Sequence, residues 1–155
     1  LTHSHVDHIL GSSWVEQTFN VPLYAHPKTD FFLQASQEYA NMFGFTLKST
    51  ATITHTVEDG EMVFLGNYAF QVITAFGHAD GSVCYYQKEQ GILFTGDVLF
   101  NDSIGRSDLP TGNHRMLINN IKEKLLILPD DTIVYPGHGP TTTIGKEKRE
   151  NYFLR

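Results

Sequence analysis

The spacing of hydrophobic residues changes near residue 50, and the change separates two kinds of predicted element. Before it, apolar side chains recur every three or four positions over residues 8–19 and 27–42, which predicts two helices with one apolar face each. Pro27 suits the first turn of the second helix. Between these helices, residues 21–25 predict a short strand.

From residue 50 onward apolar and polar residues alternate, which is the period of a strand with one buried face. The predicted strands are residues 50–56, 61–65, 68–74, 82–87, 92–95 and 132–135. Asp59-Gly60 and Gly66-Asn67 predict tight turns, and residues 116–128 and 143–152 predict two more helices. Strands that run mainly in the middle of the chain, with helices on both sides in sequence, predict sheets covered by helices in layers.

The composition narrows the function classes. The chain has 155 residues, 41% hydrophobic and 18% charged, which is enough to form one domain over residues 1–155. Its net charge of -6 includes no basic stripe, which argues against a nucleic-acid partner. No apolar run approaches membrane-spanning length and no signal-like segment opens the chain, so we expect no membrane association. The single cysteine, Cys84, excludes an internal disulfide framework and agrees with a reducing cytoplasm.

Four candidate metal ligands lie close together in the segment Thr2-His3-Ser4-His5-Val6-Asp7-His8. His3 and His5 are two residues apart, so in an extended segment they point to the same side. If the chain turns into a helix near Asp7, the adjacent Asp7 and His8 diverge from that pair. One short segment then starts two metal sites; the alternative is a polar surface loop rich in histidine.

Three further candidate ligands each follow a predicted strand and a glycine. They are found in Gly77-His78, Gly96-Asp97 and Gly137-His138. A glycine at a strand end lets the backbone turn tightly and expose the next side chain. One such pair is typical of an ordinary turn, but three of them downstream of the four-ligand segment indicate a shared site.

We divide the seven candidates into two metal sites. The first contains His3, His5 and His78, the second contains Asp7, His8 and His138, and Asp97 lies between them. Imidazole nitrogen suits zinc, with iron or manganese as alternatives, and a carboxylate can bridge two cations roughly 3.5–4 Å apart. The expected cofactors are therefore two divalent metal ions.

Such a site predicts hydrolysis. A water shared by two cations loses its proton near neutral pH, and that hydroxide is the expected nucleophile. Asp7 is placed to aim the hydroxide and Asp97 to hold both cations, so these two carboxylates are the expected catalytic residues. A thiolate leaves readily because the pKa of a thiol is only about 8.5. An amine would need a proton donor, and no clear one is seen, which favours a thioester over an amide or a β-lactam.

The order T-H-x-H-x-D-H, G-H, T-G-D and P-G-H-G resembles the metallo-β-lactamase superfamily. Residues 94–100 (F-T-G-D-V-L-F), 105–108 (G-R-S-D) and 136–140 (P-G-H-G-P) are more narrowly similar to glyoxalase II-like hydrolases, especially the short bacterial members. The resemblance implies an α/β protein with an αββα four-layer sandwich and the two metal sites divided as above. Family members carry strands before the first motif, so it also implies that this chain, which opens at Leu1, is N-terminally incomplete.

The resemblance implies a thioester substrate, but the chain departs from the glutathione-binding members of the family. A small thioester such as S-lactoylglutathione is the expected partner, and Arg106 is the expected binding residue for a carboxylate of that substrate. Two tyrosines that glutathione-binding members place near Asp108 and Pro140 are absent. Asp80 also departs from the family's G-H-T-P-G-S motif and adds a carboxylate near the site. Thioester hydrolysis is therefore better supported than glutathione as the thiol.

Two other functions stay open. One is a mononuclear iron persulfide dioxygenase, a relative with the same opening motif, against which the intact Asp7, His8 and His138 argue. The other is a non-catalytic metal-binding module of the same fold. If the first strands are missing, an exposed sheet edge would also favour dimers.

The remaining chemistry-bearing residues have ordinary interpretations. His26 and His55 are expected to be structural, whereas His114 lies at a helix start and could cap it, lie on the surface or belong to a substrate loop. Cys84 is expected in the core. The charged run at residues 146–150 is typical of a solvated helix face.

Overall fold

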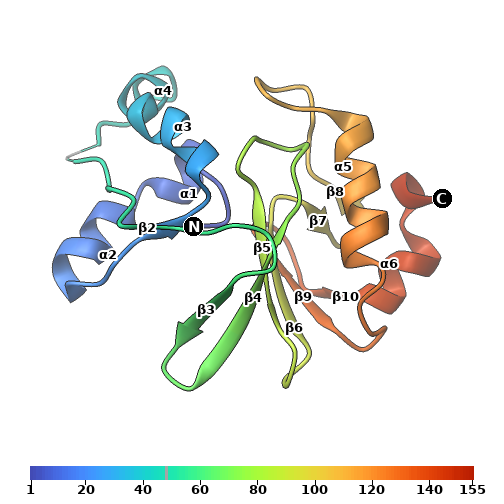
Figure 1. The fold of residues 1–155 in the computed structure, drawn as a ribbon. Helices are drawn as coiled ribbons and strands as arrows, with labels where there is room; N and C mark the ends of the chain where they lie inside the picture. The colour runs from blue at the N-terminus through green and yellow to red at the C-terminus, as the bar shows by residue number, and fades with distance from the viewer. Residues whose placement is uncertain (48) are drawn as a thin grey trace.

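A six-stranded sheet forms the centre of the computed structural model, which describes residues 1–47 and 49–155 (Figure 1). Its order is β10-β9-β6-β5-β4-β3. The strands are β3 (Met62–Leu65), β4 (Tyr68–Thr74), β5 (Val83–Gln87), β6 (Ile92–Gly96), β9 (Ile133–Pro136) and β10 (Thr142–Thr143). Neighbouring strands are antiparallel except β6 and β9, which run parallel. The alternating pattern after residue 50 predicted five of these six strands. It missed β10, whose residue Thr143 was expected to begin a helix.

The β3–β4 hairpin shows why the pattern was readable. Leu65 pairs with Tyr68, so the connection consists of Gly66 and Asn67 alone. Gly66 has a φ of 59°, a left-handed conformation that glycine adopts without a steric penalty. The predicted two-residue turn is confirmed.

Two smaller sheets consist of two-residue strands. β1 (Tyr24–Ala25) and β2 (His55–Thr56) pair in parallel, and they are all that remains of the strands expected at residues 21–25 and 50–56. β7 (Leu99–Phe100) and β8 (Ser103–Ile104) form an antiparallel hairpin that the sequence did not predict. A strand of two residues is too short to display a period.

The helices form two groups on opposite sides of the central sheet (Figure 1). The N-terminal group contains α1 (Val6–Ile9), α2 (Ser12–Phe19), the 3-10 turn η1 (Pro27–Thr29), α3 (Asp30–Gln34) and α4 (Ser36–Met42). The C-terminal group contains α5 (His114–Asn120), the π-helical turn η2 (Ile121–Leu125), α6 (Ile144–Glu150) and the 3-10 turn η3 (Tyr152–Leu154). With β1–β2 and the six-stranded sheet between them, these groups give the expected αββα layering.

Two predicted helices are broken. The helix expected at residues 8–19 divides at Leu10 and Gly11, and the one expected at residues 27–42 divides at Ala35. Glycine lowers helix stability by about 1 kcal/mol relative to alanine, which favours a break at Gly11. The period of the apolar residues continues across both breaks, so periodicity alone could not locate them.

The main core lies between the six-stranded sheet and the C-terminal helices. Its members include Leu93 and Val134 from the sheet and Leu117, Ile121 and Leu125 from α5 and η2, all fully buried. The spacing of four residues between the last three puts them on one helical face. Cys84 belongs to the same core, as expected.

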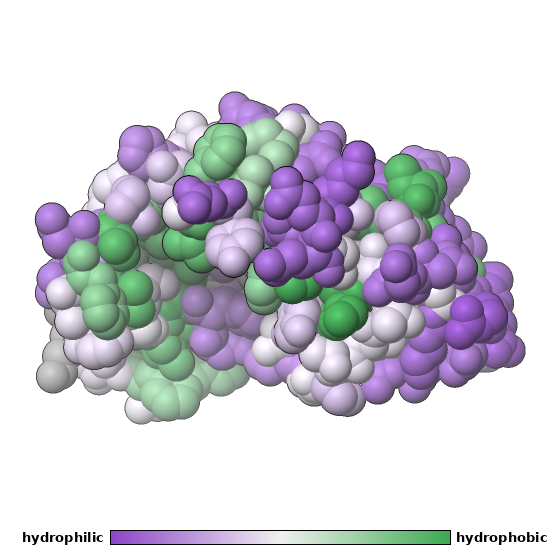
Figure 2. All heavy atoms as spheres, turned by 90° about the horizontal axis from the view of Figure 1, so that it is seen from below, coloured by the Kyte–Doolittle hydropathy of each residue, from purple (hydrophilic) through white to green (hydrophobic). Residues whose placement is uncertain are grey.

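The N-terminal helices leave more apolar surface exposed. Trp14 and Phe19 on α2 are 62% and 61% exposed, although their spacing predicted the helix itself. Figure 2 shows hydrophobic residues gathered mainly on the side of α1–α4, whereas the side of α5 and α6 is largely hydrophilic. None of the helices within the described residues has the length and apolarity needed to cross a membrane.

The charged run at residues 146–150 was interpreted as a solvated face, and this is wrong for one member. Glu147 is 0% exposed, whereas Glu150 and Arg149 lie on the surface. A helix of seven residues necessarily turns one of five consecutive positions toward its packing partner. All five residues of the run are charged, so the sequence does not indicate that Glu147 is the buried one.

Leu117→Ala should destabilise the protein by about 2–5 kcal/mol, because it removes a fully buried side chain from the centre of the main core. Met116→Ala on the same helix is the control: Met116 is 43% exposed, so its loss should change stability by about 0.5 kcal/mol. Urea unfolding followed by far-UV circular dichroism measures both. Equal losses for the two variants would contradict the placement of this core.

Candidate metal centre

The N-terminal histidine segment is tied to three other parts of the chain. The backbone carbonyl of Thr2 accepts a hydrogen bond from the Val83 amide (2.8 Å), which attaches the segment to β5. The Ser4 hydroxyl donates to the carbonyl of Thr29 (3.1 Å). Gly96 lies so close to Thr2 that a side chain there would collide with it. These contacts hold the segment against the end of the central sheet.

The segment then turns into a helix, as predicted. His5 is extended, with φ −63° and ψ 150°, and α1 begins at Val6. Asp7 and His8 therefore lie in the first helical turn. The ring of His8 nevertheless stays beside that of His3, with ring centres 4.1 Å apart, so the turn does not divide the four candidates into two separate pairs.

Two of the other candidates are brought together by the parallel pair β6–β9. Asp97 follows β6 and His138 follows β9, and the Gly137 amide donates to the Gly96 carbonyl (2.8 Å). A Cβ on Gly137 would collide with the Asp97 carboxylate and the His8 ring. Glycine at this position therefore leaves room for the side chains that meet there.

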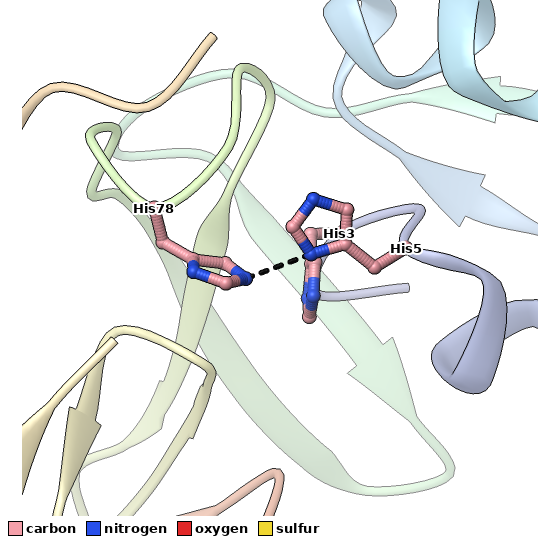
Figure 3. A group of neighbouring side chains, drawn as sticks. All are labelled: His3, His5 and His78. Atoms are coloured by element: carbon pink, nitrogen blue, oxygen red, sulfur yellow. Dashed lines mark hydrogen bonds between the residues drawn. The ribbon is translucent and has the colours of Figure 1, made fainter. Parts of the chain in front are cut away.

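The first group of donors contains His3, His5 and His78. Each offers one nitrogen, and these nitrogens all lie within 4.8 Å of one another. Figure 3 shows the three rings converging, with His78 Nε2 2.9 Å from His5 Nδ1. His3 and His78 are buried, at 1% and 2% exposure.

The orientation of His78 is fixed from behind. Its Nδ1 lies 2.8 Å from the carbonyl oxygen of Arg106, which can only accept a hydrogen bond. Nδ1 therefore carries the proton, and Nε2 presents its lone pair to the other two histidines. A hydrogen bond of this kind is the usual way in which a ligating histidine is oriented.

The second group contains Asp7, His8 and His138. Asp7 Oδ2 lies 3.0 Å from His138 Nε2, and His8 Nε2 lies 3.2 Å from the same nitrogen. The side chains of Asp7 and His138 are 51% and 57% exposed, whereas that of His8 is 14% exposed. This group is therefore the side of the centre that solvent reaches.

Asp97 lies between the two groups. Its Oδ1 is 3.2 Å from His8 Nε2, and its Oδ2 is 3.8 Å from His78 Nε2 and 3.6 Å from His138 Nε2. Asp97 also forms a third donor group with His3 and His8. The structure thus brings all seven candidate residues together. The third donor group, which joins His3 and His8, crosses the division expected from the sequence.

The donors fit divalent cations. Among the described residues, three buried side-chain atoms lack a hydrogen-bond partner, and two of them, His3 Nε2 and Asp97 Oδ1, belong to this centre. A buried lone pair without a partner carries a desolvation cost of roughly 1–3 kcal/mol. Imidazole and carboxylate are typical zinc, iron and manganese ligands, so a cation here would meet both lone pairs.

The pKa values agree with a ligand role for the histidines. Burial lowers the pKa of His3 far below its ordinary value, that of His5 to about 4, and that of His78 as well. For His8, burial opposes the charge, but the Asp97 carboxylate, whose Oδ1 lies 3.2 Å from His8 Nε2, prevails and raises the pKa. Burial would raise the pKa of Asp97, yet His8 lowers it. The first group is therefore neutral at physiological pH, which is the form that binds metal.

Arg106 contributes to the centre mainly through its backbone. Its guanidinium donates two hydrogen bonds to Asp108, from Nε (2.9 Å) and Nη2 (2.8 Å). Both side chains are well exposed, at 61% and 69%. The sequence did not reveal that Asp108 already occupies the guanidinium, nor that the Arg106 carbonyl orients His78.

The other histidines lie outside the three donor groups. His26 caps η1 by accepting a hydrogen bond from the Lys28 amide, and His55 stacks on Tyr24 with ring centres 4.6 Å apart. Asn113, rather than His114, caps α5, and His114 Nδ1 lies 3.2 Å from the Ser107 hydroxyl. His114, the first residue of α5, thereby contacts the loop that carries Arg106 and Asp108.

A shallow apolar pocket of about 300 Å³ adjoins the solvent side of the centre. His8 lines it together with the apolar side chains of Val15, Val21 and Leu23. Such a combination of an apolar hollow and a few polar groups is common in small-molecule sites.

Fold and donor geometry together define a class: an αββα protein with a histidine- and aspartate-rich centre at the sheet edge. The chain belongs to the metallo-β-lactamase superfamily, whose family profile matches residues 1–138. It is 38% identical to the hydroxyacylglutathione hydrolase GloC of Haemophilus influenzae, over 99% of this chain and 74% of that protein.

Two solved structures share the fold closely. BLEG-1, described as a B3 metallo-β-lactamase, is 42% identical with a TM-score of 0.89, over 99% of this chain and 75% of BLEG-1. TTHA1623, solved in a di-iron-bound form, is 36% identical with a TM-score of 0.91, over 99% of this chain and 75% of that protein. The expected fold class is confirmed.

The metal-free protein should lose stability as the pH falls from about 6.5 to about 4. The pKa of His5 is lowered from 6.5 to about 4 in the folded chain, so across this window the unfolded chain binds a proton that the folded chain does not. His3 and His78 act in the same direction, and the raised pKa of His8 opposes them in part.

Thermal unfolding of the chelator-treated protein between about pH 7 and pH 5 measures this effect. The midpoint should fall with pH, and His5→Gln should make the dependence shallower. A midpoint that rises toward acid would show that the histidines are protonated in the folded chain.

Proposed function

We propose that this protein is a metal-dependent hydrolase that cleaves a small thioester such as S-lactoylglutathione. The observation that carries the proposal is the pair of three-donor groups with Asp97 between them. Superfamily membership supports the hydrolase, and the similarity to GloC supports the thioester. The presence of the second group, Asp7, His8 and His138, favours two cations over the single iron of a persulfide dioxygenase.

The residues that would hold the cations follow from the geometry. The first site is formed by His3, His5 and His78, the second by Asp7, His8 and His138, with Asp97 shared. Two divalent ions there, whether zinc, iron or manganese, supply Lewis acidity for both the attacking water and the substrate carbonyl. TTHA1623 in its di-iron form is consistent with such a pair of ions, though not with one particular metal.

The chain's own side chains would then direct the reaction. Asp7, half-exposed and on the solvent side, accepts a hydrogen bond from the attacking water and points it toward the carbonyl carbon. The Arg106 carbonyl keeps His78 in the tautomer that leaves Nε2 free. Asp97 keeps the two donor groups in register, which fixes the distance between nucleophile and substrate.

The leaving group determines which substrates suit this site. A thiolate can depart without a proton because the pKa of a thiol is about 8.5. Burial opposes the charge of Asp97, but the neighbouring histidines, His8 above all, lower its pKa, so this carboxylate is ionised at neutral pH and cannot protonate an amine. A thioester is therefore a better substrate than an amide.

β-Lactam hydrolysis is the second candidate, because BLEG-1 is described as a B3 metallo-β-lactamase and is 42% identical to this chain. The same donor set would serve both reactions. The departing amine, however, again lacks an evident proton donor, so we place this activity below thioester cleavage.

Metal analysis combined with a substrate panel tests the proposal. We expect about two cations per chain, cleavage of S-lactoylglutathione or another small thioester, and loss of activity on chelation. Asp97→Ala should lose metal from both sites and at least about 100-fold of the activity, because each donor group loses a shared ligand.

Each alternative has its own result in the same experiment. Sulfite formed from glutathione persulfide with iron bound, without thioester cleavage, would identify a dioxygenase. Preferred turnover of a β-lactam would favour the second candidate. Far less than one ion per chain would indicate a non-catalytic module, and two ions retained by Asp97→Ala would refute the bridge.

Arg106 should act on substrate binding rather than on the chemical step, and Asp108 should limit it. A substrate carboxylate must displace Asp108 from the guanidinium, so Asp108→Asn should lower KM for an anionic thioester by roughly threefold. Arg106→Ala should raise KM and leave kcat nearly unchanged.

A neutral thioester is the control, since its KM should respond to neither substitution. A large fall in kcat with unchanged KM in Arg106→Ala would mean that the side chain stabilises the transition state. An unchanged KM for both substrates would remove Arg106 from the binding site.

A further inference from the structure

A buried carboxylate on α6, Glu147, contacts the turn of the β7–β8 hairpin, strand β10 and the residue that follows α6. Glu147 is 0% exposed and accepts hydrogen bonds from three partners. They are the Asp102 amide (3.1 Å to Oε2 and 3.3 Å to Oε1), the Thr142 hydroxyl (2.5 Å) and Asn151 Nδ2 (2.7 Å). A buried carboxyl group is costly unless its oxygens have partners. Here both oxygens accept hydrogen bonds, and Lys146 Nζ lies 3.6 Å from Oε1.

These bonds hold the turn of the β7–β8 hairpin. The turn residue Asp102 has a φ of 58°, a conformation that few non-glycine residues adopt. Asn151 also donates to the Ser103 carbonyl (3.0 Å), and Lys146 Nζ donates to Asn101 Oδ1 (2.6 Å) and to the Asp102 carboxylate. Hydrogen bonds from α6 and from Asn151 therefore fix the turn of the hairpin.

Both arms of that hairpin end in the metal centre. The first arm starts at Asp97, and the second continues into Gly105 and Arg106. The Gly105 amide donates to the Val98 carbonyl (3.2 Å), and a side chain on Gly105 would collide with the Asp97 carbonyl. The Arg106 carbonyl in turn orients His78.

We propose that Glu147 is a positioning residue for the metal centre. By fixing the hairpin tip it sets the two arms in the arrangement that presents Asp97 between the donor groups and the Arg106 carbonyl behind His78. The proposal rests on the metal-binding function proposed above. Glu147 touches neither substrate nor cation, so it acts only through the hairpin.

The side chain of Glu147 only accepts hydrogen bonds, and its partners donate them. Substitution by glutamine, which has nearly the same size, is therefore informative. A carboxylate only accepts hydrogen bonds, whereas a glutamine amide also donates. The amide nitrogen of Glu147→Gln would therefore face at least one donor, either the Asp102 amide or Asn151 Nδ2. The hairpin tip should shift while the size of the side chain stays the same.

The test compares Glu147→Gln with Thr143→Ala in the full chain. Thr143 caps α6 by accepting a hydrogen bond from the Lys146 amide (3.2 Å), so its loss weakens the same helix without removing a hydrogen bond to the hairpin. Zinc affinity is measured by competition with a chromophoric chelator, and the coordination geometry by the visible spectrum of the cobalt-loaded protein. Unfolding of the metal-free forms is recorded in parallel.

We expect Glu147→Gln to bind zinc about 10- to 100-fold more weakly than the wild type and to change the cobalt spectrum. Thr143→Ala should lose stability but keep the wild-type affinity and spectrum. Wild-type affinity and spectrum in Glu147→Gln, with only a loss of stability, would overturn the proposal. A wild-type chain that binds no zinc would instead refute the proposed function.

A second variant covers the case in which Glu147→Gln does not fold. Asn151→Ala removes the bond to the Ser103 carbonyl and one bond to Glu147, and leaves the other two partners of Glu147 in place. It should weaken zinc binding in the same direction by a smaller factor. Unchanged zinc binding in a folded Asn151→Ala protein would contradict the proposed grip on the hairpin.

Discussion

The convergence of unshared lone pairs at one edge of the central sheet is the constraint on which the rest of this molecule depends. Imidazole nitrogens approach one another to 2.9 and 3.2 Å, and the half-buried carboxylate of Asp97 lies among them. Such an arrangement is repulsive or unsatisfied unless a proton or a cation lies between the donors. The packing must therefore hold these groups together against their own electrostatics. Three features hold the donors together: the close packing around Gly96, Gly105 and Gly137, the hydrogen bonds from α6 to the β7–β8 turn, and the hydrogen bond between Thr2 and β5.

The two donor groups of the centre differ in how far their side chains are exposed to solvent. His3 and His78 are buried, whereas Asp7 and His138 remain half-exposed. One donor group is thus enclosed by protein and the other faces water. The side that needs rigidity is the one connected to the main core, through β4, β6 and the hairpin. The open side carries the groups that would meet a substrate.

Much of this site was predictable because its signals are local. The two-residue spacing of His3 and His5, the turn into a helix at Asp7, and a glycine before each of the other ligands can all be recognised within a few positions. The six-stranded sheet was equally accessible, since alternation over four or more residues records a buried face. Breaks at Gly11 and Ala35 were not, because apolar spacing continues through them.

Contacts between side chains of separate segments and on exposed loops could not be predicted from the sequence. The burial of Glu147 depends on a hairpin 45 residues earlier, and that hairpin has strands too short to show a pattern. The engagement of Arg106 by Asp108 is a matter of rotamers on an exposed loop, which no periodicity records. Local chemistry identified the candidate ligands, and tertiary structure alone revealed what orients His78 among them.

The contact between His8 and His138 has a consequence for the order of folding. His8 and His138 meet across 130 positions, so the second donor group closes only when nearly all of the described fold is in place. Contacts of such high sequence separation form late, because the chain must first lose the entropy of closing a long loop. A nascent chain leaving the ribosome therefore displays His3, His5 and His8 well before their partners exist. A cation held by both donor groups would therefore report completed folding, rather than nucleate it.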